Sequence, residues 1–434
     1  MNVLVLAPLR ASADHAIDGA WKGPLRFEHA TFDQTMSHHA PGVVVDLPNP
    51  AGGKPVRVEH RFSSLASFHP ESIRAENGYV RSLALEAPQA PSAGSSLLDD
   101  ILDGMGSREA KEENRADAAA SALASHPEVR AIERAWRGLH FLTASANEDV
   151  VITAFPAAAD DVDAVLAELA NAAQLDLVVV DHIIDGSPRD LERLEGWARR
   201  AEAISTPVIC GGVPALLGHD DLESLGRSQR RLRASDAPRA SALRATAAQD
   251  AMRWIAIALN GSRAASAPEL VAAACVASFV RTGWPCAITG PIAGTGPLEA
   301  TVTEDVATEA AAAGVILLAS TDGGAMIAEA NVLHREASRG GTSPAASLSL
   351  VDQLFLVRLG QTVTQLAASI PAGSDPAAAR EAALVVLTEL FAQGNGKKPT
   401  IDVAIAGRML EVTVRARGFE EVRLDEATLG ARLT

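Results

Sequence analysis

The stretch SHPEVRAIERAWRGLHFL, residues 125–142, carries several helix signals at once. Ser125 and Glu128 stand at the spacing of a capping box, in which each side chain bonds the other residue's backbone N–H. A set of mainly apolar residues recurs at the helical period and therefore lines one face. These residues are Val129, Ile132, Trp136, Leu139 and Thr143. The sequence thus predicts an amphipathic helix over 125–142.

Downstream of this helix, apolar segments alternate with amphipathic ones. Strand-like runs at 150–155, 176–181 and 206–211 are separated by helical patterns at 160–173 and 189–204. The run LVVV at 177–180 is apolar at every position, as is typical of a strand covered on both faces. This alternation indicates an α/β fold with mixed β-sheets covered by helices. The remaining pattern predicts helices at 238–259, 268–282, 304–313, 347–369 and 375–391, and strands at 284–288, 298–302 and 315–318.

The two ends of the chain follow a different pattern. Residues 1–87 are rich in predicted strands, at 3–9, 25–32, 43–48 and 55–65, followed by a short helix that begins at Pro70. Near the C-terminus, 400–405 and 409–415 alternate apolar and polar residues around Ala406-Gly407-Arg408, which indicates a β-hairpin. A two-stranded hairpin alone is only marginally stable in water. We therefore expect it to pair with a further strand of its own chain or of a neighbour.

Composition divides the chain into four parts. A Pro-, Ala-, Ser- and Gly-rich run follows the N-terminal strands and indicates a linker. The sequence predicts a β-rich region with an N-terminal strand arm at 1–87, a linker at 88–96, an α/β core at 97–398 and a hairpin arm at 399–434.

Charge and composition exclude several classes of function. The chain has 434 residues, of which 47% are hydrophobic, and this is enough for two or three domains with buried cores. Its formal net charge of −16 repels phosphate backbones and anionic membrane surfaces, so we expect no nucleic-acid binding. Basic or neutral protein surfaces are the expected partners.

The cysteines and the apolar runs indicate the cellular compartment of the protein. Cys210, Cys275 and Cys286 lie far apart in apolar surroundings and are interpreted as reduced core thiols of a cytoplasmic protein. The sequence shows no secretory signal pattern and no apolar run of about eighteen residues, so we expect no direct membrane insertion.

Residues 285–297, PCAITGPIAGTGP, form the strongest enzyme-like feature, because closely spaced glycines could bring backbone N–H groups near a phosphate. Their spacing matches neither a dinucleotide-binding motif nor a P-loop, and no lysine follows, so a structural loop is favoured. The pairs His38-His39 and Asp181-His182 offer metal ligands, but no third ligand stands at a suitable spacing. We therefore predict no catalytic residues, no bound cofactor and no metal site.

Several segments resemble one known family. The string ERAWRGLH at 133–140 is similar to the signature helix of the large sheath subunit of type VI secretion systems. Residues 191–218 and 279–299 resemble other parts of that subunit, with Thr289 at a position where the family has arginine. Residues 56–73 resemble the small sheath subunit. Their order along the chain suggests that both sheath polypeptides are fused here.

The resemblance implies a structural protein rather than an enzyme. Subunits of this contractile-sheath family polymerise helically around an inner tube, and their terminal strands cross to adjacent subunits to complete a shared sheet by β-augmentation. A helical homopolymer is therefore expected. An inner tube protein, baseplate proteins and a recycling ATPase are the further partners that the resemblance implies.

Two sets of residues are candidates for contacts between subunits. The first set comprises the apolar positions of two candidate strand arms, namely Val3, Val5, Leu6, Ile401, Val403, Ile405, Leu410, Val412 and Val414. The second set lies on the signature helix and comprises Glu133, Trp136, Arg137 and His140, of which Glu133 and Arg137 stand at ion-pair spacing.

Three other interpretations stay open at this point. A static, non-contractile tubule derived from a sheath fits the same residues. A baseplate or adaptor protein with the same core, which does not polymerise, also fits. A small-molecule enzyme that uses loop 285–297 is the least favoured.

Overall fold

The computed structural model describes residues 1–17, 23–49, 53–85, 115–169, 174–228, 232, 235–335, 347–371 and 373–433. The chain forms two compact units. The larger unit contains Met1–Ala7, Pro24–His29 and Gly138–Thr434, and the smaller unit contains Pro8–Gly23 and Ala30–Arg137. Among the described residues, no helix is both long enough and apolar enough to cross a membrane.

A seven-stranded sheet organises the larger unit. Its strand order is β10-β8-β7-β6-β1-β5-β2. All neighbouring strands are parallel except β2, which pairs antiparallel with β5 at one edge. The strands are β1 (Asn2–Ala7), β2 (Leu25–Phe27), β5 (Val151–Pro156), β6 (Leu177–Ile184), β7 (Val208–Gly212), β8 (Ile255–Leu259) and β10 (Val315–Leu317).

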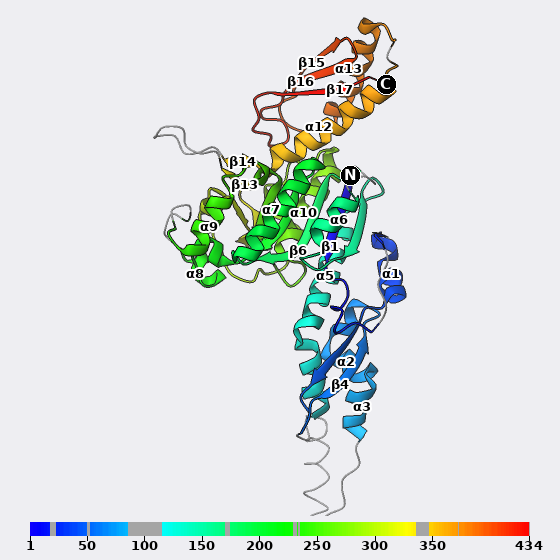
Figure 1. The fold of residues 1–434 in the computed structure, drawn as a ribbon, viewed down its shortest axis with the longest axis vertical. Helices are drawn as coiled ribbons and strands as arrows, with labels where there is room; N and C mark the ends of the chain where they lie inside the picture. Colours follow the sequence, from blue (N-terminus) through cyan, green and yellow to red (C-terminus); the bar gives the residue numbers. More distant parts are fainter. Residues whose placement is uncertain are drawn as a thin grey trace, which may run out of the picture. The chain divides into compact units, whose positions relative to one another are not determined.

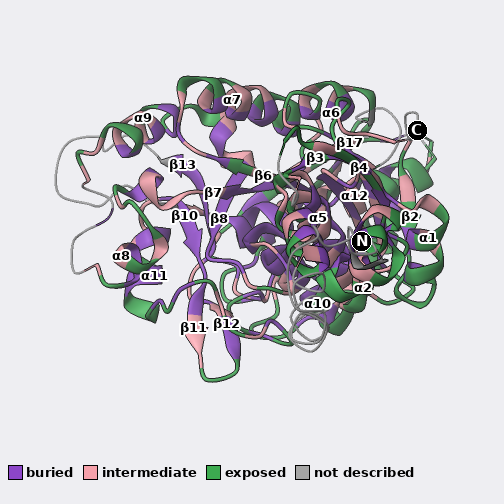
Figure 2. Ribbon diagram, turned by 90° about the horizontal axis from the view of Figure 1, so that it is seen from below, coloured by how far each residue is buried: buried purple, intermediate pink, exposed green. Residues whose placement is uncertain are grey.

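Helices cover both faces of this sheet (Figure 2). On one side lie α6 (Val162–Leu169), α7 (Pro188–Ala203) and α9 (Pro238–Thr246), and on the other lie α10 (Ala267–Thr282) and α11 (Glu304–Ala311). Both α7 and α10 contact β6, β7 and β8. Because parallel strands need covered faces, the middle of the sheet is apolar and buried, as the purple strands of Figure 2 show. The predicted α/β architecture is confirmed at this level.

Strand β1 corrects the expectation of an N-terminal arm. It lies inside the sheet, with β5 on one edge and β6 on the other, so it has no open edge. Val3, Val5 and Leu6 are at most 1% exposed. An all-apolar strand is more stable when both faces are covered than when it is exposed as an arm, and here the chain's own helices and strands cover it.

The C-terminal part of the larger unit is drawn orange to red in Figure 1. It contains α12 (Leu350–Ser369), α13 (Pro376–Ala392) and a three-stranded antiparallel sheet in the order β15-β16-β17. The predicted hairpin is confirmed as β15 (Thr400–Ala406) and β16 (Met409–Arg415). It is not a free arm, because β17 (Ala427–Arg432) pairs with β16 and both α12 and α13 contact the sheet.

Three assignments in the core, one helix and two strands, were wrong. The predicted helix at 238–259 ends as α9 at Thr246, and Ile255–Leu259 forms the fully buried strand β8. A short apolar run fits a buried strand as well as a helix, and only its place in the sheet decides. The predicted strands at 284–288 and 298–302 are irregular.

Small sheets occupy this region instead. Strand β9 (Gly290–Ile292) pairs with β12 (Gly324–Ile327), which pairs with β11 (Ala319–Thr321). A separate antiparallel pair joins β13 (Asn331–Arg335) to β14 (Ser347–Ser349), directly before α12.

The smaller unit joins a hairpin to several helices. Strands β3 (Gly42–Leu47) and β4 (Val56–Arg61) pair antiparallel, as predicted. Around them the unit contains α1 (Phe32–His39), α2 (Pro70–Glu76), α3 (Gly78–Leu85), helical residues 115–125 and α5 (Pro127–Ala144) as far as Arg137. Helix α1 replaces the end of the strand predicted at 25–32, so residues 1–87 are less β-rich than expected.

The predicted domain boundaries change accordingly. Residues 1–87 do not form one region, because β1 and β2 belong to the larger unit. The predicted core at 97–398 is divided as well, since residues up to Arg137 belong to the smaller unit. Residues 399–434 belong to the larger unit. The linker predicted at 88–96 lies outside the described residues.

Candidate functional site

The signature helix forms as α5, but it begins differently from the prediction. Its first residue is Pro127, and the Ser125 hydroxyl donates to the carbonyl of Ala122 instead of capping the helix. The Glu128 carboxylate accepts hydrogen bonds from the backbone N–H and the hydroxyl of Ser12, at 3.2 and 2.9 Å. The expected Ser125–Glu128 capping box is therefore wrong, because Glu128 binds a segment distant in sequence.

Trp136 is a core anchor of the smaller unit. Its side chain is fully buried, and its indole N–H donates to the carbonyl of Leu9 at 2.8 Å. Phe32 contacts the same indole edge to face, with ring centres 5.9 Å apart. The face predicted around Trp136 is confirmed as buried, since none of its five residues is more than 1% exposed. Trp136 itself therefore has no surface to offer a partner.

The other three candidates on this helix are partly exposed. The Arg137 guanidinium donates to the Glu133 carboxylate at 2.7 Å, and both side chains are about a quarter exposed, at 28% and 26%. A pair of this kind contributes about 0.5 kcal/mol or less to stability. The His140 ring lies 5.3 Å from the ring of His29, in the larger unit. Glu133, Arg137 and His140 can therefore contact a partner without disturbing the core.

The packing around position 138 explains why a glycine stands between Arg137 and Leu139 in this chain. A Cβ atom at this position would lie 2.7 Å from Oε2 of Glu269 and closer still to its Cδ and Oε1. Glu269 is fully buried and closes the capping box of α10, where it accepts from the N–H of Ser266 at 2.9 Å and from the Ser266 hydroxyl. The helix start of α10 thus needs the space that Gly138 leaves.

The glycine-rich loop 285–297 connects parts of the larger unit. Gly290, Gly294 and Gly296 all have positive φ, as tight loop turns require. The N–H groups of Ile288 and Thr289 donate to Oε2 of Glu421, at 3.3 and 3.1 Å. A carboxylate of the chain therefore occupies two backbone donors at the start of this loop.

The titratable clusters also have structural partners. His182 Nε2 lies 3.4 Å from the Asp190 carboxylate, which also accepts from Arg193 at 2.7 Å. Within the described ranges, no group of three or more histidine, cysteine or acidic residues is arranged to hold a metal ion. The three cysteines are free and buried, and burial raises the pKa of Cys275 to about 12. Cys275 is therefore a protonated core thiol at neutral pH.

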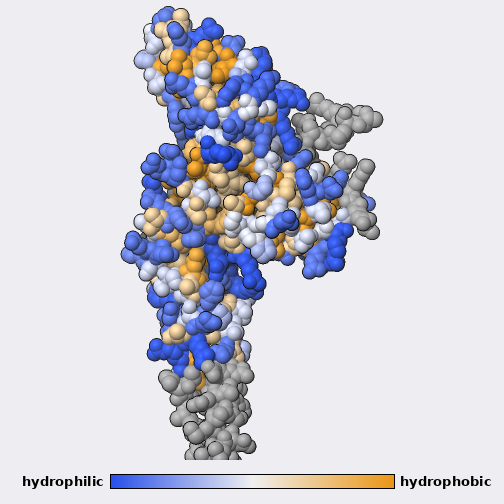
Figure 3. Space-filling view, turned by 180° about the vertical axis from the view of Figure 1, so that it is seen from behind, coloured by the Kyte–Doolittle hydropathy of each residue, from blue (hydrophilic) through white to orange (hydrophobic). Residues whose placement is uncertain are grey.

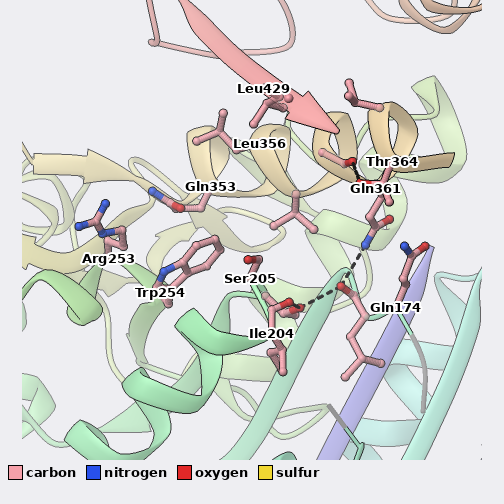
Figure 4. A pocket seen from close by; sticks show the side chains of 16 residues that line it. Gln174, Ile204, Ser205, Arg253, Trp254, Gln353, Leu356, Gln361, Thr364 and Leu429 are labelled. Atoms are coloured by element: carbon pink, nitrogen blue, oxygen red, sulfur yellow. Dashed lines mark hydrogen bonds between the residues drawn. The ribbon is translucent and has the colours of Figure 1, made fainter. Parts of the chain in front are cut away.

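A groove of about 570 Å³ lies at one end of the strands of the large sheet (Figure 4). Ligands of such sheets usually bind at the other end. Its floor comes from residues directly before β6, β7 and β8, and its other wall comes from α12 and β17. Ligands of doubly wound sheets bind at the carboxyl ends of the strands, whereas this groove lies at their amino ends. The groove therefore differs in position from a typical enzyme site of this architecture, and no sequence motif marked it.

A second surface that the sequence did not reveal is the outer face of α13. Its inward stripe, Ala379, Ala383, Leu387 and Phe391, is buried. On the outer side, Val385 and Val386 are 51% and 42% exposed. Figure 3 shows apolar side chains gathered on this C-terminal part of the larger unit. Large contiguous apolar patches mark surfaces that contact other proteins, and these two valines form only a small one.

Compared with models of known protein families and with curated proteins, the chain matches none.

Proposed function

We propose that this chain is a structural protein that assembles into a helical sheath or tubule, similar to the contractile sheath of type VI secretion systems. The support is the resemblance of the signature helix and its flanking segments, together with an α/β unit that carries a small antiparallel sheet with an open edge. That open edge is the observation on which the proposal depends.

The open edge belongs to β17. The strand pairs with β16 on one side and ends the sheet on the other. The N–H of Leu433 donates to the carbonyl of Arg408 on the β16 side. Because N–H groups alternate sides along a strand, those of Thr428, Gly430 and Arg432 point away from β16. They are donors for one more strand.

The other edge of this sheet is less accessible. The guanidinium of Arg380, from α13, donates to the outward carbonyl of Val403 on β15 at 2.8 Å, and the same guanidinium lies 3.9 Å from Asp402. A side chain thus covers the middle of β15. We therefore propose that the link between subunits is at β17, and not at the two candidate strand arms that the sequence indicated, around residues 3–6 and in the hairpin of β15 and β16.

Strand addition at β17 would link copies of the chain through main-chain hydrogen bonds, so each link is directional and repeatable. A contact between two different surfaces of the same chain generates a helix when the rotation does not close into a ring. Under this proposal the protein acts in the cytoplasm without catalysis, and its partners are its own copies, an inner tube protein, baseplate proteins and a recycling ATPase. A static tubule is the alternative form of the same assembly.

The test is a pair of substitutions at one position. Gly430→Pro removes the outward N–H donor of β17, whereas Gly430→Ala keeps it. The alanine Cβ would lie 3.4 Å from the Met409 side chain, which is an ordinary contact. We expect tubes from the wild type and from Gly430→Ala, and unassembled protein with an unchanged circular dichroism spectrum from Gly430→Pro. Tubes of normal length from folded Gly430→Pro would contradict the role of β17.

A further inference from the structure

The groove beside β17 carries an inference about what the open edge accepts. Leu429 and Gly430 of β17 line this groove together with Gln353 of α12 and with Arg253 and Trp254 (Figure 4). The open edge therefore does not face bulk solvent alone. A strand added along β17 would place its side chains in this groove.

Charge in the groove is the first argument. Arg253 is the one charged side chain among the described residues that line it. Its neighbour Asp250 lies 3.7 Å away and is 81% exposed, so this ion pair is weak and screened by solvent. In a chain with a net charge of −16, the groove is thus a local site that favours a carboxylate.

The side-chain amide of Gln353 is a second, independent feature of the groove. Gln353 is only 5% exposed, and Figure 4 shows it extending from α12 toward Arg253 and Trp254. Among the described residues its side-chain amide has no hydrogen-bond partner. The amide is not one of the unpaired side-chain groups that are cut off from solvent, so its donor and acceptor open into the groove. A primary amide has a donor and an acceptor side by side, which matches the N–H and C=O of a peptide group.

We propose that this groove receives an extended segment of a neighbouring subunit that carries an acidic residue. Arg253 binds the carboxylate, Gln353 bonds the peptide backbone, and the outward N–H groups of β17 pair with the added strand. Apolar side chains of the segment pack on Leu356 and Leu429. The inference rests on the proposed function, because it defines the chemistry of the strand that β17 accepts.

The test uses two labelled peptides that differ in one residue, Ser-Val-Glu-Val-Thr and Ser-Val-Lys-Val-Thr, both with blocked ends. Fluorescence anisotropy measures their binding to the full chain and to two variants. Arg253→Gln removes the groove's charge. The matched control, Arg227→Gln, removes an arginine whose pair with Glu223 is exposed and lies outside the groove.

We expect the wild type to bind the glutamate peptide at least about ten times more tightly than the lysine peptide, a difference of about 1.4 kcal/mol. Arg253→Gln should abolish that preference, and Arg227→Gln should retain it. Equal binding of both peptides, no binding of either, or a preference that persists in Arg253→Gln would overturn the inference. Electron microscopy of the wild type tests assembly separately from this peptide binding. If the wild type forms tubes but shows no peptide preference, the inference about the acidic segment is wrong and the proposed self-assembly stands.

Discussion

Replacing Gly138 by alanine tests whether this position must be glycine to make room for the buried carboxylate of Glu269. The added Cβ would lie 2.7 Å from Oε2 of Glu269 and nearer to two further carboxylate atoms, so Glu269 must move. Inserting a methyl group into a packed site costs about 1–3 kcal/mol. A disturbed helix cap adds about 1 kcal/mol to this loss of stability. The higher helix propensity of alanine offsets about 1 kcal/mol of it. The net loss is about 1–3 kcal/mol.

Differential scanning calorimetry is the appropriate assay, because a chain with two units need not unfold in one step. The transition of the larger unit should move down by several degrees. Gly360→Ala in α12 is the matched control, since no atom lies within 4 Å of its added Cβ. It should raise stability by about 0.4–1 kcal/mol. If Gly138→Ala melts at or above the wild type, the contact with Glu269 does not explain the glycine.

Three further substitutions test other contacts in the structure. Trp136→Phe leaves the buried carbonyl of Leu9 without its donor and should lower the stability of the smaller unit by about 1–3 kcal/mol, measured from its calorimetric transition. Glu421→Ala removes the acceptor of two loop N–H groups and should cost about 1–2 kcal/mol in the same assay, with no loss if those bonds are irrelevant. Burial raises the pKa of Asp352 above its usual 3.8, so the wild type loses stability relative to Asp352→Asn as the pH rises through that raised pKa. Below pH 3.8 the two proteins should respond to pH alike, and a stability difference that does not change with pH would contradict the assignment.

The sequence revealed the periodic elements of this fold and missed the contacts that join them. The run LVVV at 177–180 was recognised as a covered strand because every position is apolar, and it forms part of β6. At the N-terminus the strand β1 is equally apolar, yet the sequence analysis predicts an exposed arm there. Strand pairing is set by contacts between residues far apart in the chain, and β1 pairs with strands about 150 and 175 residues away.

Other features had no local signal. Strand β17, with the sequence ATLGAR, contains few β-branched residues, and its pairing with β16 determines its conformation. The contact of Gly138 with Glu269 joins positions separated by more than a hundred residues. The groove is formed from segments before three different strands, together with α12 and β17, and its amide residue, Gln353, lies in the first turn of α12 without any motif around it.

We propose that this chain assembles into helical tubes by itself. The most direct measurement is negative-stain electron microscopy of the purified full-length chain, expressed without other proteins. We expect tubes of regular diameter, and one diameter under all conditions would identify the static form. Discrete small particles at every protein and salt concentration would contradict self-assembly.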